Sequence, residues 1–161
     1  MSEGVEWAVH SCLNLSWLEP GEAVPAARMA AYYALPAAYL NKQLQALARA
    51  GILASTPGPR GGFRLARSPA DISLMDVVAA IEGPDEAFRC EEILRRAPGE
   101  HEGVDYRRLC PVSQSMRRAE MAWRRQLAGQ SIADLRAEVE RRRPSVPADT
   151  RARFADLRTR S

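Results

Sequence analysis

Hydrophobic residues recur every three or four positions along the first fifty residues, a spacing that predicts amphipathic helices. The first predicted helix covers residues 5–18, and its apolar face consists of Val5, Ala8, Val9, Cys12, Leu13 and Trp17. A second helix is expected from Pro25 to Tyr33, because proline suits a first helical turn. A third is expected from Ala37 to Ala50, where Gly51 ends it. Two helices joined by so short a break form a helix-turn-helix.

Two short apolar runs follow the third helix and predict a β-hairpin. Residues 52–55 and 63–66 fit short strands, and the segment 56–62 between them is rich in glycine and proline. Arg60 lies near the tip of this loop. The expected fold is therefore mainly α, a winged helix-turn-helix with a two-stranded wing.

Further helices are predicted in the second half of the chain. Ser73 and Asp76 match a capping box that begins a helix ending at Glu82. A long helix is expected from Pro111, with apolar residues on one stripe, and a short helix follows Ser131.

The remaining segments differ in composition and divide the chain into four parts. The loop before the long helix is acidic and interrupted by proline, whereas the C-terminal segment is rich in arginine, proline and alanine. We expect that last segment to be a basic, disordered tail. The four parts are a winged-helix domain over 1–84, a loop over 85–110, two helices over 111–140 and the tail over 141–161.

Charge is distributed unevenly, although the 161 residues carry a formal net charge of only +3. Residues 24–67 contain no acidic residue and six basic ones, which are Arg28, Lys42, Arg49, Arg60, Arg64 and Arg67. Residues 68–110 are acidic overall, and the tail holds seven basic residues against two acidic ones. A small protein with one acid-free basic block has a one-sided field that attracts polyanions.

Composition excludes several classes of protein. With 46% hydrophobic and 27% charged residues the chain can bury a core. No apolar run reaches the roughly 18 residues of a membrane helix, and the first residues do not match a secretory signal. Three cysteines, an odd number, argue against a disulfide framework and for a reducing, cytoplasmic location. Cys12 lies on an apolar face and is expected in the core.

The third helix and the hairpin carry residue types that read DNA. Asn and Gln amides bond adenine edges, and Lys reaches guanine or a phosphate, in a major groove that admits one helix. Arginine on the hairpin can enter a minor groove or bind phosphate, and Arg67 would add a contact. The alternative is a solvated helix and hairpin in some other small fold. The predicted DNA-binding residues are Arg28, Ala38, Tyr39, Asn41, Lys42, Gln43, Arg60, Gly61 and Arg64.

Several motifs spread over the first 135 residues occur together. They are Val5-Glu6-Trp7-Ala8, Pro25-Ala26-Ala27-Arg28-Met29-Ala30, Tyr39-Leu40-Asn41-Lys42-Gln43-Leu44, Leu47-Ala48-Arg49-Ala50-Gly51-Ile52-Leu53, Gly61-Gly62-Phe63-Arg64-Leu65-Ala66, Ile72-Ser73-Leu74-Met75-Asp76-Val77-Val78 and Ser131-Ile132-Ala133-Asp134-Leu135. In these motifs the chain resembles the IscR/NsrR-type (Rrf-two) bacterial transcription regulators. The resemblance implies a homodimer that binds a near-palindromic operator in double-stranded DNA. It makes the long helix the dimerisation helix, with Met116, Trp123 and Leu127 at the interface.

The resemblance also implies a sensor in the loop before the long helix. Many members of the family hold an iron–sulfur cluster with three closely spaced cysteines. This chain instead has Cys90 and Cys110 with nineteen residues between them, and in this wide pair it is most similar to RsrR-type redox sensors. Two cysteines alone cannot complete a 2Fe–2S cluster, which needs four ligands.

Candidates for the remaining ligands come from the same resemblance. Glu6 matches an acidic residue that reaches the cluster from the partner subunit. Tyr33 stands where the RsrR-type sensors have a histidine, and phenolate can ligate iron. His10 lies one turn after Glu6, and His101 lies between the two cysteines, so these two histidines are the other candidates.

The expected function is a dimeric, sequence-specific transcription regulator, not an enzyme, controlled by redox state through a 2Fe–2S cluster. The alternative is a cluster-free regulator that responds to thiol oxidation, a small molecule or a protein partner. A zinc site or a purely structural role for the cysteines also stays open. Zinc is disfavoured because the Cys-x-x-Cys spacing of structural sites is absent, and the same absence argues against a thiol enzyme.

Overall fold

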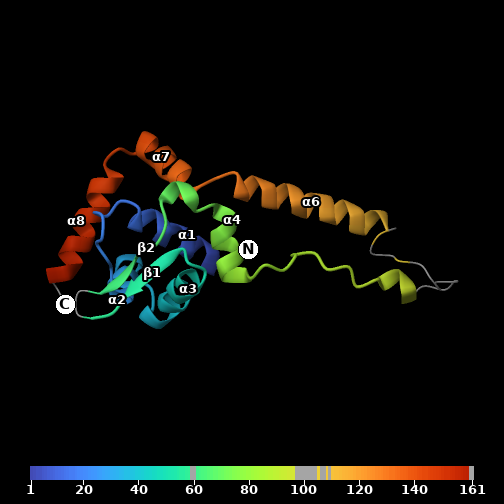
Figure 1. The fold of residues 1–161 in the computed structure, drawn as a ribbon, viewed down its shortest axis with the longest axis horizontal. Helices are drawn as coiled ribbons and strands as arrows, with labels where there is room; N and C mark the ends of the chain where they lie inside the picture. Colours follow the sequence, from blue (N-terminus) through green and yellow to red (C-terminus); the bar gives the residue numbers. More distant parts are fainter. Residues whose placement is uncertain (59–60, 97–104, 106–107, 109, 160–161) are drawn as a thin grey trace.

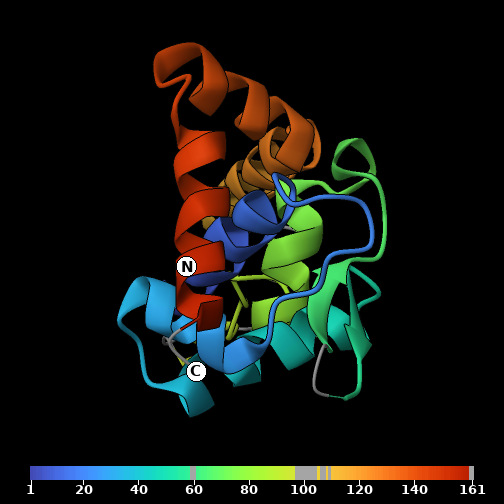
Figure 2. The same cartoon turned by 90° about the vertical axis from the view of Figure 1, so that its left-hand side faces the viewer.

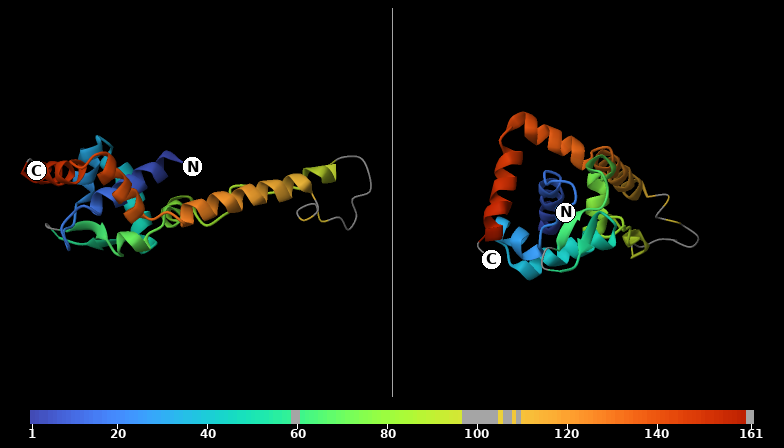
Figure 3. Two further views of the ribbon diagram at one scale, coloured as in Figure 1. Left: turned by 90° about the horizontal axis from the view of Figure 1, so that it is seen from above. Right: turned by 60° about the vertical axis from the view of Figure 1, so that its left-hand side comes forward.

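One long helix projects as an arm from a helical body (Figures 1 and 3). The computed structural model describes residues 1–58, 61–96, 105, 108 and 110–159. The segment that follows α4 runs outward from the body, and α6 (Pro111–Ala128), the arm, returns alongside it. Within the described residues, no helix is both long and apolar enough to span a membrane.

Three helices and a tight turn form the first half of the body. α1 (Glu3–Leu15) lies at its centre, followed by α2 (Ala26–Tyr33) and α3 (Ala37–Arg49). Ala34, which ends α2, has a φ of 55° in the left-handed region, and the Leu35 amide donates to the Ala30 carbonyl at 2.9 Å. The chain thereby reverses within three residues, and the predicted helix-turn-helix is confirmed.

The wing is a two-stranded antiparallel hairpin of β1 (Leu53–Thr56) and β2 (Gly62–Leu65), each shifted by one residue from the prediction. Phe63 also exchanges both backbone hydrogen bonds with Val24, at 2.8 and 2.9 Å. At Gly62 the φ is 148°, and a Cβ atom would lie 2.3 Å from the Val24 carbonyl carbon. Only glycine fits this close approach, which fastens the wing to the body.

Two capping boxes set where α4 (Leu74–Glu82) and α7 (Ile132–Arg142) begin. Ser73 and Asp76 form the first box and Ser131 and Asp134 the second, each with both reciprocal hydrogen bonds. The two helix starts lie side by side, because the Leu74 amide donates to the Gln130 carbonyl at 2.8 Å. Two short 3₁₀ turns, η1 (Pro69–Asp71) and η2 (Ile93–Arg96), complete this half of the chain.

One hydrophobic core joins these elements. Its largest fully buried side chains come from α2, α3, the segments before β1 and α4, α7 and the C-terminal helix, and include Met29, Leu40, Leu44, Leu47, Ile52, Ile72, Ile132 and Phe154. Cys12 is buried among them as a free thiol, so its predicted place in the core is confirmed.

The C-terminal segment corrects one prediction. Residues Val146–Thr159 form a helix, α8, that packs on α2 and is not a disordered tail. Disorder was predicted because the segment is rich in arginine, proline and alanine. Its single aromatic residue, Phe154, is nevertheless only 1% exposed and packs in the core. Pro147 does not oppose the helix because it stands in the first turn, where its missing amide hydrogen is not needed.

Candidate nucleic-acid interface and sensor site

α3 and the wing lie at the same end of the body (Figure 2). Leu40, Leu44 and Leu47 face the core, so the helix can turn its other side to solvent. On that side Ala38 and Lys42 are exposed and Tyr39 and Asn41 are half-buried. These are residue types and exposures that suit a helix entering a major groove.

Gln43 does not belong to this face. Its side chain is 9% exposed, and its amide atoms lie 3.2 Å from where a Cβ atom of Gly4 would stand. Position 43 is three residues after Leu40, so it falls on the buried stripe of α3 and packs against α1. The prediction that Gln43 contacts DNA is therefore wrong for this arrangement.

The wing offers one exposed arginine among the described residues that were predicted to bind DNA. Arg64 is exposed on β2 and bonds only the neighbouring Leu65 carbonyl, at 3.3 Å. Arg60, at the wing tip, lies outside the described residues. Gly61 is buried, and a Cβ atom there would stand 2.0 Å from the Thr56 carbonyl oxygen. Gly61 thus shapes the hairpin and does not present a surface for DNA.

Two further basic residues of the acid-free block differ in exposure. Arg67 is exposed, donates to the Asp71 carbonyl at 3.2 Å and lies 3.9 Å from the Asp76 carboxylate. Arg28, on α2, is half-buried, and its Nε atom has no hydrogen-bond partner within the described part of the chain. Arg67 thus has an acidic neighbour on the surface, whereas Arg28 keeps an unmet donor.

The two predicted cysteine ligands line one pocket at the outer end of the arm. Cys90 and Cys110 are free thiols, both half-buried, in a pocket of about 270 Å³. Phe88, Ile93 and Val112 give the pocket an apolar lining. Cys110 is also the N-cap residue of α6, so its sulfur is attached directly to the start of the arm.

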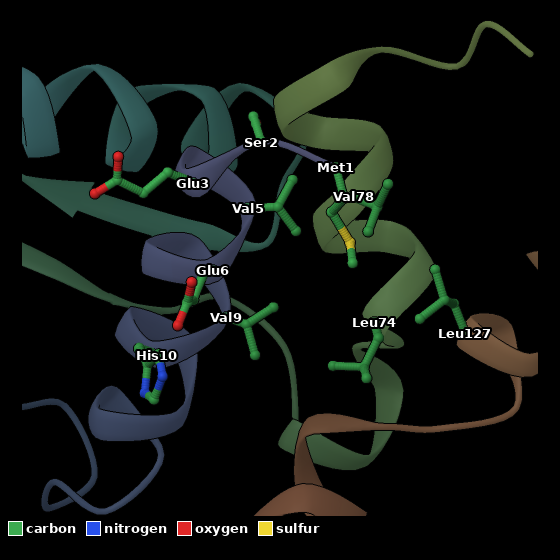
Figure 4. A pocket seen from close by; sticks show the side chains of 10 residues that line it. All are labelled: Met1, Ser2, Glu3, Val5, Glu6, Val9, His10, Leu74, Val78 and Leu127. Carbon is green, nitrogen blue, oxygen red and sulfur yellow. The ribbon is translucent and has the colours of Figure 1, made fainter. Parts of the chain in front are cut away.

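Glu6 and His10 share a different pocket, of about 520 Å³, against the body (Figure 4). Both are exposed, and both project from α1 above an apolar floor that includes Val9, Leu74 and Leu127. Among the described residues, no three His, Cys, Asp or Glu side chains are grouped as a metal site. Of the predicted ligands that the structure describes, Glu6 and His10 therefore lie in one pocket and Cys90 and Cys110 in another.

Tyr33 turns into the body. Its ring lies 5.1 Å from that of Trp7, and its hydroxyl oxygen accepts a hydrogen bond from the Asn14 amide at 2.8 Å. Burial raises the pKa of the Tyr33 phenol above its ordinary value, which opposes formation of a phenolate. The other alternative ligand, His101, lies outside the described residues.

The stripe predicted for dimerisation is only partly covered by the chain itself. Trp123 and Leu127 are half-buried near the base of the arm, whereas Met116 is 44% and Val112 65% exposed.

Sequence reasoning missed Val112 as a lining residue of the cysteine pocket, along with Phe88 and Ile93. Their signal was apolar character inside an otherwise acidic loop and at the first turn of a helix.

Most of the chain, including the helix-turn-helix, the wing and the arm, matches one protein family. Residues 1–138 match the family model of Rrf2, whose members are described as iron-dependent transcriptional regulators. The chain belongs to the Rrf2 family. It is therefore a DNA-binding transcription regulator and not an enzyme, and the resemblance inferred from its motifs is confirmed.

Relatives of this Rrf2 protein differ in how much of the chain they share. The candidate HTH-type transcriptional regulator YffB of Lactococcus lactis is 31% identical over 140 residues, 87% of this chain and 88% of YffB. IscR of Vibrio atlanticus is 31% identical over 84 residues, 52% of this chain and 49% of IscR. The match thus spans about half the length of IscR.

Solved structures share the fold of this Rrf2 protein at low sequence identity. IscR of T. potens gives a TM-score of 0.65 at 21% identity, over 89% of this chain and 90% of that one. CymR (YrzC), titled the global cysteine regulator of B. subtilis, gives 0.64 at 19% identity, over 86% and 96%. Identities this low support the winged-helix fold and nothing finer.

Proposed function

We propose that this Rrf2 protein is a homodimeric, sequence-specific regulator whose operator affinity is set by redox state through a 2Fe–2S cluster. The observation that carries the proposal is the separation of its candidate ligands into two pockets, Cys90 with Cys110 and Glu6 with His10. Two thiolates from one copy, with a carboxylate and an imidazole from a second copy, make the four ligands required. When bound, the cluster supplies one-electron redox chemistry.

The choice of His10 as the fourth ligand rests on how the candidates are exposed. Glu6 and His10 are four residues apart on one helix, so both side chains leave α1 on the same face. Tyr33 is the weaker candidate because its hydroxyl is bonded to Asn14 and its ring is packed on Trp7. The donor set of thiolates, imidazole and carboxylate fits the group.

The proposed coupling between the cluster and DNA binding follows from where the cluster ligands are attached. Cys110 begins the arm, whereas Glu6 and His10 stand on α1, which packs on α3. Ligands from both copies would tie the arm of one copy to the DNA-binding body of the other. A coupling free energy of about 1–3 kcal/mol would change operator affinity about 5- to 150-fold.

The proposed DNA contacts combine the exposed face of α3 with the wing. Lys42 and Arg64 are exposed, and Arg28 is half-buried. The proposed set, with Gln43 and Gly61 removed, is Arg28, Ala38, Tyr39, Asn41, Lys42, Arg60 and Arg64. Replacing Lys42 by Ala should weaken binding to all duplexes and lower the slope of log K against log salt by about 1.

Anaerobic purification tests the cluster. We expect visible absorption, an EPR signal after one-electron reduction, and equal iron and sulfide counts in the wild-type protein. Cys90→Ser, Cys110→Ser and His10→Ala should lose these signals, whereas Tyr33→Phe should keep them and serves as the control. Cysteine variants that bind a selected operator duplex with wild-type affinity in both redox states would overturn redox control.

Mixing two variants tests whether each site needs two copies. A Cys90→Ser/Cys110→Ser protein and a Glu6→Ala/His10→Ala protein should each bind no iron alone. Coexpression should restore about a quarter of the wild-type iron, because half of the dimers are mixed and each mixed dimer has one intact site. No restoration would mean that the ligands come from one chain.

A cluster-free regulator that responds to thiol oxidation is the second candidate. The two free thiols that share one pocket favour it over a small-molecule or protein signal. In that case the purified protein would be colourless, and a two-electron oxidant such as diamide would join Cys90 to Cys110, which mass spectrometry would detect as the loss of two hydrogen atoms. Visible and mass spectra of the purified protein therefore decide between the two candidates.

A further inference from the structure

α2 is a short helix with few fully buried residues. It spans eight residues, of which only Met29 and Ala30 are buried. Helices this short depend on tertiary packing, and the left-handed Ala34 that follows costs further free energy. We infer that the C-terminal helix α8 is a brace for the helix-turn-helix. Its contacts hold α2 in the position that DNA binding requires.

The contacts between α8 and α2 converge on Tyr32. Its ring stacks on that of Phe154, with centroids 4.7 Å apart and an interplanar angle of 24°. The Arg153 guanidinium carbon lies 5.0 Å from the centre of the Tyr32 ring, and the Tyr32 hydroxyl lies 3.5 Å from the Thr150 hydroxyl. Stacking and cation–π contacts each contribute beyond simple burial.

The neighbouring tyrosine is held by α1 on the other side. Tyr33 packs on Trp7 and accepts the hydrogen bond from Asn14, and the rings of Tyr32 and Tyr33 meet edge to face at 5.0 Å. Two adjacent residues at the end of α2 therefore connect it to α1 and to α8. Removing the α8 contact would leave the end of α2 held by α1 and α3 but without the partners of Tyr32.

α8 and the preceding α7 are both fastened to the residues that follow α1. From α8, Arg151 donates to the Trp17 carbonyl at 3.2 Å. From α7, Arg136 donates to the Ser16 carbonyl at 2.8 Å, and Glu140 accepts a hydrogen bond from the Trp17 indole at 2.8 Å. α8 is thus held to the body through Trp17 and through α7, independently of α2.

This brace lies outside the part of the chain that matches the family. The Rrf2 match ends at residue 138, whereas α8 covers Val146–Thr159. In a helix-turn-helix the first helix crosses the DNA backbone while the second enters the groove. A shift of α2 would move α3 through their three-residue connection, so α8 bears on the DNA-binding geometry without touching DNA.

The test compares two core substitutions in the full-length protein. The probes are a duplex selected by the wild-type protein from a random library, and a scrambled duplex of equal length. Phe154→Ala should weaken binding to the selected duplex at least about tenfold, leave binding to the scrambled duplex nearly unchanged, and speed hydrogen exchange in α2. Ile132→Ala, equally buried but in α7, is the control and should keep both affinities. A folded Phe154→Ala protein with wild-type affinity would overturn the inference.

A second pair of variants tests whether α8 positions α2 for DNA binding, even if Phe154→Ala fails to fold. Arg153→Gln removes the cation from the Tyr32 ring, and Arg143→Gln removes an exposed arginine from the end of α7. Both lose one positive charge and neither opens a cavity. We expect Arg153→Gln to lower affinity for the selected duplex at least about twofold more than Arg143→Gln. Equal losses would assign the effect to charge alone and would overturn the inference.

Discussion

At the scale of single residues, Cys12 illustrates how burial separates a structural thiol from a reactive one. Burial raises its pKa to about 12, so the thiol stays protonated in the folded protein at neutral pH. A thiolate is the reactive form of cysteine, and Cys12 supplies almost none. The half-buried Cys90 and Cys110 stand apart from it in both position and exposure.

The first prediction follows from this difference. In reduced, cluster-free protein at pH 8, iodoacetamide should modify Cys90 and Cys110 and leave Cys12 untouched. Peptide mass mapping would identify the labelled cysteines, and unfolding in urea should expose the third as an internal control. Labelling of Cys12 in the native protein at the rate of the other two would contradict its burial.

The same residue gives a pH dependence with a definite sign. The Cys12 thiol ionises near pH 8.5 in an unfolded chain but only near pH 12 in the folded one. The unfolded state therefore releases the proton first, and this group lowers the free energy of unfolding as the pH rises from about 8.5 toward 12. Urea unfolding of the wild type and Cys12→Ala across that range would isolate the contribution.

At the scale of elements, the turn between α2 and α3 stores unfavourable backbone conformation. Ala34 has a φ of 55°, a region that glycine adopts without the penalty of a side chain. Ala34→Gly should raise the free energy of unfolding by about 0.5–1 kcal/mol. Ala31→Gly, within α2, should lower the free energy of unfolding by about 1 kcal/mol.

Circular dichroism during urea unfolding would measure both variants. If Ala34→Gly were as destabilising as Ala31→Gly, the turn would not be left-handed. A gain in stability with unchanged DNA affinity would show that the shape of the turn, and not its strain, matters for function.

Elements with periodic patterns were predictable, and those fixed by distant contacts were not. The α3 stripe of Leu40, Leu44 and Leu47 and the two capping boxes are local signals, so the helix-turn-helix and the starts of α4 and α7 followed from sequence. Gln43 was misassigned because its burial depends on α1 approaching closely at Gly4. α8 was missed because its stability comes from Phe154 meeting Tyr32, a contact that no local pattern reveals.

The candidate site was predictable in part for the same reason. The motifs identified the residue types of the DNA-binding face, but whether Arg67 is free or paired depends on Asp76 in another element. The cysteines were found by their chemistry, whereas their common pocket depends on the segment after α4 running outward beside α6. That Glu6 and His10 lie in a different pocket could only come from the three-dimensional arrangement.

At the scale of the whole molecule, the arm exposes apolar surface far from the body. Val112 and Met116 stand on the stripe that includes Trp123 and Leu127, and Met121 lies on the opposite face of α6. A helix projecting from a small body with such a stripe uncovered is typical of a subunit interface. The homodimer proposed above would form through this helix.

Substitution on the two faces of α6 tests the dimer. Met116→Arg should convert the protein to monomers, because it places a charge in the apolar stripe. Met121→Arg makes the same chemical change at a residue of similar exposure, 50% against 44%, and should leave the dimer intact. Sedimentation velocity would give the two masses. Dimers of normal stability in Met116→Arg would rule out this stripe as the interface.

The contact between Tyr32 and α8 also has a consequence for the order in which the chain matures during synthesis. The Tyr32 and Thr150 hydroxyls that meet in the folded protein are 118 residues apart in sequence. A ribosome adding about 5–20 residues per second needs roughly 6–24 seconds to cover that distance. For that interval the nascent chain has its recognition helix but not its brace. If α8 positions α2 as inferred above, a nascent chain gains its operator-binding geometry only after α8 has been synthesised.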